Sequence, residues 1–136
     1  MEIGATKAVQ ERLKITKIDE IKGASLVFCW DTHLVKIKGR NVLFIVNASN
    51  RYTIAMTDIE PRNWKYYTLY ISRVIHGVMQ QMGYSESQID QYFQMSGDMS
   101  VTKTHGKKSV GGINRMITDA QYFDKKLEKD TKYQWE

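Results

Sequence analysis

Residues 33–56 read HLVKIKGRNVLFIVNASNRYTIAM, and this stretch decides the fold. Hydrophobic and charged side chains alternate through residues 33–38. Residues 42–47 predict a second strand that begins with the apolar run 42–46, and residues 52–56 again have the composition of a strand. Two short turns rich in glycine, asparagine and serine separate these segments. Strands joined by such short turns pair as antiparallel hairpins, so the stretch predicts a β-meander. The apolar residues 25–30 predict one further strand before it.

Helices flank this β-rich block on both sides. Thr6 is a suitable N-cap for a short helix before the block. After the block, apolar residues spaced three, four and seven apart predict one long helix over residues 61–82. Ser85 and Gln88 have the spacing of a capping box and predict another helix that ends near residue 95.

The end of the chain predicts a strand over residues 99–104 and a final helix that begins at Ser109. Strands that cluster, instead of alternating with helices, favour the α+β class. We therefore expect an antiparallel sheet of about five strands with three or four helices packed against it. Residues 1–124 are expected to form a single domain. The charged tail, residues 125–136, is expected to be a helical extension or a subunit contact.

The composition is that of an ordinary globular protein. The chain has 136 residues, of which 42% are hydrophobic and 26% charged. No apolar run approaches the roughly 20 residues needed to cross a bilayer, and no secretion signal is visible, so we expect a cytoplasmic protein. The formal net charge of +5 favours anionic partners such as nucleotides, phosphorylated metabolites or nucleic acid. The single cysteine, Cys29, is expected to be a small buried side chain.

The segment VTKTHGKKSVGGIN, residues 101–114, has the pattern of an anion-binding strand–turn–helix. A helix N-terminus presents free N–H groups and the positive end of the helix dipole to a ligand. The polar and cationic residues around this helix end are Lys103, His105, Lys107, Lys108, Ser109 and Asn114. The segment is not a Walker A loop, because the first glycine and the Ser or Thr of that motif are both missing. Alternatively, the glycines let the helix pack closely on the sheet and the lysines are solvated.

A second candidate site is the hairpin turn that contains Asn47, Arg51 and Tyr52. Arg51 could bind a phosphate or carboxylate through two hydrogen bonds, and Tyr52 could stack on a base. The alternative is a polar turn in which Arg51 pairs with Asp58 or Glu60.

A third candidate is the group Trp30, Asp31 and His33 at the start of the meander. Asp31 and His33 would share one strand face, which is a weak indication of acid–base or metal chemistry. His76 and His105 are too scattered to complete a metal site of recognisable spacing. No G-x-S-x-G, H-E-x-x-H or C-x-x-C motif occurs. We therefore expect no metal, no cofactor and no catalytic residue.

These segments together resemble a family of small bacterial, plasmid and phage proteins known as a domain of unknown function. The shared pattern is W-x-x-x-L, a basic turn, V-N-x-x-x-R-Y, and a basic residue followed by S-V-x-G-x-x-N. In this chain the pattern falls on Trp30, Leu34, residues 38–40, Val46, Asn47, Arg51, Tyr52, Lys108, Ser109, Val110, Gly111 and Asn114. Members often have histidine where this chain has Asp31, and arginine where it has Lys108. The resemblance implies no particular activity, but its polar residues concentrate in the candidate sites.

The sequence favours a protein that binds a phosphorylated small molecule without changing it. The expected ligand is a nucleotide or a nucleotide-derived immune signal, as in a phage-type anti-defence sponge, to which the chain is similar in size and charge. The predicted ligand-binding residues are Trp30, His33, Arg40, Asn47, Arg51, Tyr52, Lys103, His105, Lys107, Lys108, Ser109 and Asn114. A homo-oligomer could enclose the ligand between subunits. The alternatives are a nucleic-acid-binding regulator and a small phosphoesterase-like enzyme that uses Asp31, His33 and His105.

Overall fold

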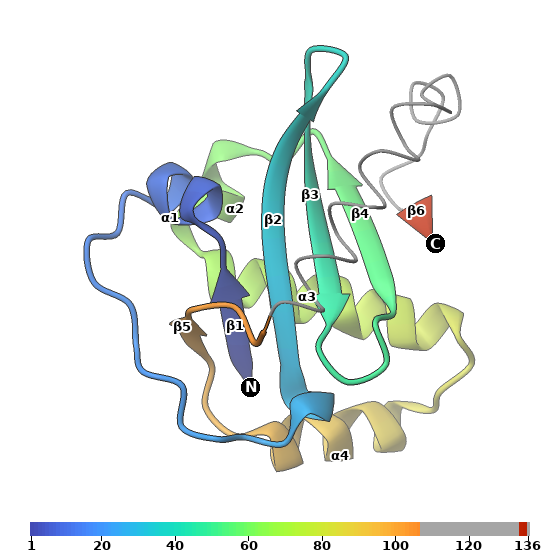
Figure 1. Ribbon diagram of the computed structural model, residues 1–136. Coiled ribbons are helices and arrows are strands. Elements are labelled where there is room, and N and C mark those ends of the chain that lie inside the picture. Colours follow the sequence, from blue (N-terminus) through green and yellow to red (C-terminus); the bar gives the residue numbers. More distant parts are fainter. Residues whose placement is uncertain (107–133, 136) are drawn as a thin grey trace.

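A mixed β-sheet forms the centre of the fold (Figure 1). The structure is a computed structural model that describes residues 1–106, 134 and 135. Within these residues the sheet has six strands in the order β5-β1-β2-β3-β4-β6. The strands are β1 (Glu2–Ala5), β2 (Cys29–Ile37), β3 (Arg40–Asn47), β4 (Thr53–Thr57), β5 (Ser100–Thr102) and β6 (Gln134–Trp135). Helices pack against this sheet, which confirms the expected α+β class.

The predicted meander is formed by β2, β3 and β4, which pair antiparallel in chain order. β2 is one continuous strand, although the sequence predicts two segments, residues 25–30 and residues 33–38. A short 3₁₀ turn, Leu26–Phe28, replaces the first part of that prediction. The expected break at Asp31 and Thr32 does not occur. Both polar side chains are fully buried in the strand, because each has hydrogen-bond partners from neighbouring segments.

β1 is a strand that the sequence analysis does not predict. It has only four residues and is buried on both faces, so it shows no alternation of polar and apolar side chains. It lies between β2 and β5 and pairs parallel with both. The sheet is therefore mixed rather than purely antiparallel as expected. The crossover from β1 to β2 contains α1 (Lys7–Leu13), the short helix predicted after Thr6.

The expected long helix is divided in two. α2 (Pro61–Lys65) and α3 (Tyr67–Gln81) are separated at Tyr66, whose φ of −112° and ψ of 55° lie outside the helical region. α3 runs across one face of the sheet (Figure 1). The predicted capping box is present at the start of α4 (Glu86–Ser96). The Ser85 side chain accepts the backbone N–H of Gln88, and the Gln88 side chain accepts the backbone N–H of Ser85.

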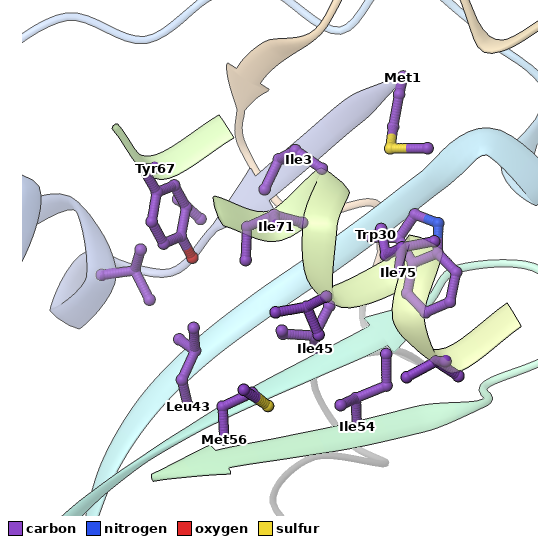
Figure 2. Packing of buried hydrophobic residues seen from close by; sticks show 14 of the residues in the cluster. Met1, Ile3, Trp30, Leu43, Ile45, Ile54, Met56, Tyr67, Ile71 and Ile75 are labelled. Atoms are coloured by element: carbon purple, nitrogen blue, oxygen red, sulfur yellow. The ribbon is translucent and has the colours of Figure 1, made fainter. Parts of the chain in front are cut away.

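Two hydrophobic clusters lie on the two faces of the sheet. The larger cluster packs the sheet against α3 (Figure 2) and includes Ile3, Leu43, Ile45, Ile71 and Ile75. The smaller cluster consists of Ile37, Val42, Phe44, Val46 and Ala55. β3 contributes to both, which explains why its sequence is apolar on consecutive residues.

The remaining predictions concern the end of the chain. The strand expected at residues 99–104 is present as the shorter β5. The helix expected from Ser109, and the expected domain boundary at residue 124, lie outside the described residues. Gln134 and Trp135, from the expected tail, form β6 and pair with β4. Among the described helices, none has the length and apolar composition of a membrane span.

Two substitutions on α3 test the packing of this helix. Ile71 is fully buried, whereas Leu69 is 48% exposed on the same helix. Ile71→Ala should lower the free energy of unfolding by about 2–5 kcal/mol, because it leaves a cavity in the core. Leu69→Ala should change it by only about 0.5 kcal/mol. Urea denaturation followed by circular dichroism measures both. Equal effects of the two substitutions would contradict this placement of α3.

Candidate functional site

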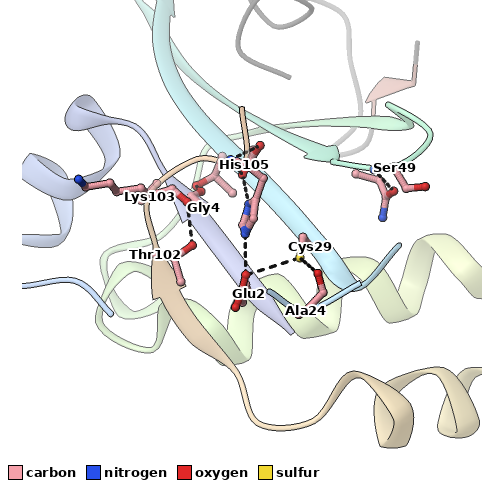
Figure 3. A network of polar contacts seen from close by, with 12 residues as sticks. Glu2, Gly4, Ala24, Cys29, Ser49, Thr102, Lys103 and His105 are labelled. Atoms are coloured by element: carbon pink, nitrogen blue, oxygen red, sulfur yellow. Dashed lines mark hydrogen bonds and ion pairs between the residues drawn. The ribbon is translucent and has the colours of Figure 1, made fainter. Parts of the chain in front are cut away.

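The first part of the predicted anion-binding segment ends in a buried polar cluster on β1 and β2. After β5 the chain crosses these strands, and the His105 side chain lies between two carboxylates (Figure 3). His105 Nδ1 is 2.6 Å from Asp31 Oδ1, and His105 Nε2 is 2.8 Å from Glu2 Oε1. The three side chains are only 3%, 0% and 6% exposed. The cluster is therefore a carboxylate–imidazole–carboxylate arrangement that is closed off from solvent.

This geometry favours the imidazolium form of the His105 ring, because each ring nitrogen faces a carboxylate oxygen to which it can donate. Burial by itself would lower the His105 pKa, but the hydrogen bonds to Asp31 and Glu2 outweigh it and raise the pKa. Burial would likewise raise the Glu2 pKa. The backbone N–H of Lys22 and the His105 ring outweigh that effect and lower it. Each buried charge thus has a compensating partner.

Gly4 allows the Asp31 carboxylate to occupy its position. The two residues are directly opposite each other in the parallel β1–β2 pair. A Cβ atom at position 4 would lie 2.0 Å from Asp31 Oδ1, so any other residue there would displace the carboxylate from this position. The same carboxylate also accepts the His105 backbone N–H, at 3.1 and 3.0 Å from its two oxygens. Asp31 therefore fixes both the ring and the backbone of His105.

Cys29 completes the cluster and is buried, as the sequence predicts. Its Sγ is 3.7 Å from Glu2 Oε1. Burial and the neighbouring Glu2 carboxylate raise the pKa of the thiol to about 11, so it is protonated at neutral pH. Cys29 is thus no free nucleophile in this environment.

The other predicted residues lie in several places. His33 follows Asp31 on the same face of β2, and its buried Nδ1 has no hydrogen-bond partner among the described residues. Arg40 pairs with Asp58 at 2.9 Å, at the other end of the meander from His105. Lys103 is exposed beyond β5. The predicted residues Lys107, Lys108, Ser109 and Asn114 lie outside the described residues.

The β3–β4 turn is shaped by Asn47, one of the predicted ligand-binding residues. Its Nδ2 donates to the Val27 carbonyl at 3.1 Å, and its Oδ1 accepts the backbone N–H groups of Ser49 and Asn50. Asn47 is thus a structural residue of the turn. Neither partner expected for Arg51 forms a described ion pair with it, since Asp58 pairs with Arg40 and Glu60 with Arg62.

Three of the predicted residues, Trp30, Asn47 and Tyr52, meet at a cleft of about 390 Å³ on the helix side of the sheet. The cleft lies between the β3–β4 turn and the facing parts of α3 and α4. Among the described residues the lining consists of three kinds of side chain. The aromatic ones are Phe28, Trp30, Tyr52, Tyr84 and Tyr92, and the amides are Asn47, Asn50, Gln88 and Gln91. The aliphatic and thioether side chains are Val27, Ile75, Val78, Met79, Met82 and Met95. No charged side chain is part of this lining.

A hydrogen-bonded chain fixes the aromatic floor of the cleft. Trp30 Nε1 donates to the Tyr92 hydroxyl at 3.0 Å, and that hydroxyl donates to the Val27 carbonyl at 2.6 Å. The Phe28 and Tyr92 rings lie 5.2 Å apart. No local signal in the sequence marks Tyr92 as a site residue, because aromatic residues on the apolar face of a helix have the same spacing in a core as in a cleft.

His105 can be tested against His76, which forms an exposed pair with Glu86. His105→Ala should lower the free energy of unfolding by about 3–5 kcal/mol, because it leaves Glu2 and Asp31 buried without a cation. His76→Ala should have a much smaller effect, because water solvates its partner. Denaturant unfolding of both variants provides the measurement. A His105→Ala protein as stable as His76→Ala would contradict the buried arrangement.

Comparison with known proteins gives one match, to a protein family. The family model described as "Domain of unknown function (DUF6933)" matches residues 2–136. No curated protein and no solved structure matches the chain. The match includes both the polar cluster and the cleft, and it confirms the resemblance to an uncharacterised family. The chain therefore belongs to the DUF6933 family.

Proposed function

We propose that this protein binds a nucleotide-like molecule without chemically changing it, with the base in the aromatic cleft. One observation carries the proposal: five aromatic side chains and four side-chain amides surround a single cleft of about 390 Å³. Small-molecule sites are typically concave and mainly apolar, with a few polar groups that fix the orientation of the ligand. The cleft has this composition.

The aromatic part of the lining suits the flat face of a base. The rings are those of Phe28, Trp30, Tyr52, Tyr84 and Tyr92. Stacking of a base on an aromatic side chain contributes about 1–3 kcal/mol, and every base offers such a face. The hydrogen bonds between Trp30, Tyr92 and Val27 hold part of this surface in place before a ligand arrives. Less conformational freedom is then lost on binding.

The polar part of the lining suits the edge of a base. Amide side chains offer both donors and acceptors, which are the groups that a base edge presents in complementary positions. Gln91 is one of the four amide side chains that line the cleft. Because the lining has no charged side chain, a phosphate would remain at the mouth of the cleft.

Arg51 is the cation that we assign to such a phosphate. It lies between two residues of the lining, Asn50 and Tyr52, and is itself exposed. Its φ of 62° belongs to the tight turn that follows β3. A guanidinium binds phosphate through two parallel hydrogen bonds. The proposed ligand is therefore phosphorylated, as the sequence predicts. Its base would lie in the cleft and its phosphate would bind Arg51.

Binding without turnover is favoured by the character of the lining. Within the described residues the cleft contains no carboxylate, histidine or cysteine that could act as a general base or nucleophile. Of the three residues considered for a phosphoesterase, Asp31, His33 and His105, two are buried and bonded to each other, namely Asp31 and His105. The proposal therefore assigns the protein to ligand sequestration or sensing.

The base-stacking part of the proposal can be tested with Tyr84→Ala. Tyr84 lines the cleft and is 46% exposed, so its loss should not disturb the core. Isothermal titration with adenosine, guanosine, their monophosphates and a cyclic dinucleotide should identify at least one ligand, which Tyr84→Ala should weaken about 5–100-fold. Tyr66→Ala, an exposed tyrosine on the α2–α3 junction, is the matched control and should bind normally. If no compound binds more tightly than about 1 mM, the proposal is wrong.

The phosphate part of the proposal can be tested with Arg51→Ala. This change should weaken binding of a nucleoside monophosphate about 10-fold or more, since a hydrogen bond to a charged group contributes about 1.5–3 kcal/mol. Binding of the corresponding nucleoside should be unaffected. Arg62→Ala, which removes an exposed arginine paired with Glu60, is the control. Equal losses for nucleoside and nucleotide would show that Arg51 shapes the turn and does not contact phosphate.

A further inference from the structure

Glu2, Cys29 and His105 present three different metal-ligating atoms around one point on the sheet face opposite the cleft. Within residues 1–106, 134 and 135, these are the residues whose donor atoms group closely enough for a shared ion. Their ligating atoms all lie within 4.8 Å of one another. We propose that these three side chains bind one Zn²⁺ ion, and that Asp31 positions the imidazole. The site is independent of the proposed nucleotide cleft.

The donor set selects the metal. Zinc in proteins is bound by cysteine thiolate, histidine nitrogen and carboxylate oxygen, usually with four ligands. Calcium and magnesium prefer sites made of oxygen atoms alone, so the thiol and the imidazole argue against them. Three protein ligands would leave one position of a tetrahedral zinc ion for a further ligand.

The strand pairing explains how these ligands meet. Glu2 and Cys29 are directly opposite each other in the parallel β1–β2 pair, so their side chains project from the same face. Figure 3 shows the two side chains next to each other, with the His105 ring above Glu2. His105 follows β5, which pairs with the other edge of β1. The ligands therefore come from three adjacent segments, which are β1, β2 and the residues that follow β5.

Asp31 has the position of a residue that orients a metal-bound histidine. Its carboxylate is 2.6 Å from His105 Nδ1 and also binds the His105 backbone N–H. A carboxylate on one ring nitrogen fixes the tautomer and directs the other nitrogen to the metal. Here the other nitrogen, Nε2, points to Glu2 Oε1 at 2.8 Å. A zinc ion would replace the proton that now lies between these two atoms.

Metal binding would leave the buried charge unchanged. In the metal-free cluster the two carboxylates are negative, the imidazolium is positive and the thiol is neutral. Coordination releases the Nε2 proton of His105 and the thiol proton of Cys29, and adds the two positive charges of zinc. The net charge of the cluster is −1 before and after. The surrounding residues that accommodate the metal-free cluster therefore also suit the zinc-bound cluster.

The test uses the full-length protein after removal of metals with a chelator. Cobalt(II) is the probe, because a tetrahedral cobalt–thiolate complex has a charge-transfer band in the near ultraviolet. Cys29 is the only cysteine in the chain, so this band can come from no other residue. We expect one cobalt ion per chain with the thiolate band, and displacement of cobalt by zinc. Zinc should also raise Tm by about 5 °C or more, because it joins β1, β2 and the segment after β5.

Three variants test a proposed zinc ligand, the residue that orients His105, and binding of zinc at the surface. Cys29→Ala should abolish the thiolate band and the zinc-dependent rise in Tm. Asp31→Asn should retain the band and bind zinc about 10–100-fold more weakly. His76→Ala removes a histidine from the exposed pair with Glu86 and should behave like the unchanged protein.

The proposal would be overturned by either of two results. One is cobalt binding without a thiolate band. The other is zinc binding that is unchanged in Cys29→Ala. If that binding were lost in His76→Ala, the zinc ion would belong to the exposed pair of His76 and Glu86. Nucleotide titrations of the same variants keep the two proposals separate, because Cys29→Ala should leave the cleft and its ligand affinity unchanged.

Discussion

Two carboxylates, those of Glu2 and Asp31, are buried on one face of the sheet, and both depend on the single imidazolium of His105. Removing charged groups from water costs several kcal/mol each unless partners compensate. That compensation requires β1 between β2 and β5, since these strands bring the three residues together. It also requires Gly4, which leaves the space that the Asp31 carboxylate occupies. The parallel half of the sheet and the charged cluster therefore stabilise each other.

β2 connects the cleft and the polar cluster. Successive side chains of a strand point to opposite faces, so Trp30 contributes to the cleft while Cys29 and Asp31 contribute to the polar cluster. The helix face offers aromatic rings and neutral amides, and the other face offers buried charge and a thiol. The cleft and the charged cluster therefore lie on opposite sides of β2, which keeps the uncharged cleft separated from the carboxylates.

The sequence predicted the elements whose signals are local. The β2–β4 meander followed from alternation and turn residues, and the α4 capping box from two residues three positions apart. β1 is too short and too uniformly buried to give a pattern. Of the site residues, His105 was selected for its charge beside a glycine turn. Its partner Glu2 could not be found, because no sequence pattern links residues 103 positions apart.

That long separation has a consequence for how the chain folds during synthesis. The hairpins of the meander involve neighbouring residues and can form early, whereas β1 gains its second neighbour only when β5 has been made. Until His105 emerges from the ribosome, Glu2 and Asp31 have no cation to pair with, and water must solvate them. The open edge of β1 is then available to other chains. Closing this half of the sheet should therefore be the slow, aggregation-sensitive step in the maturation of the protein.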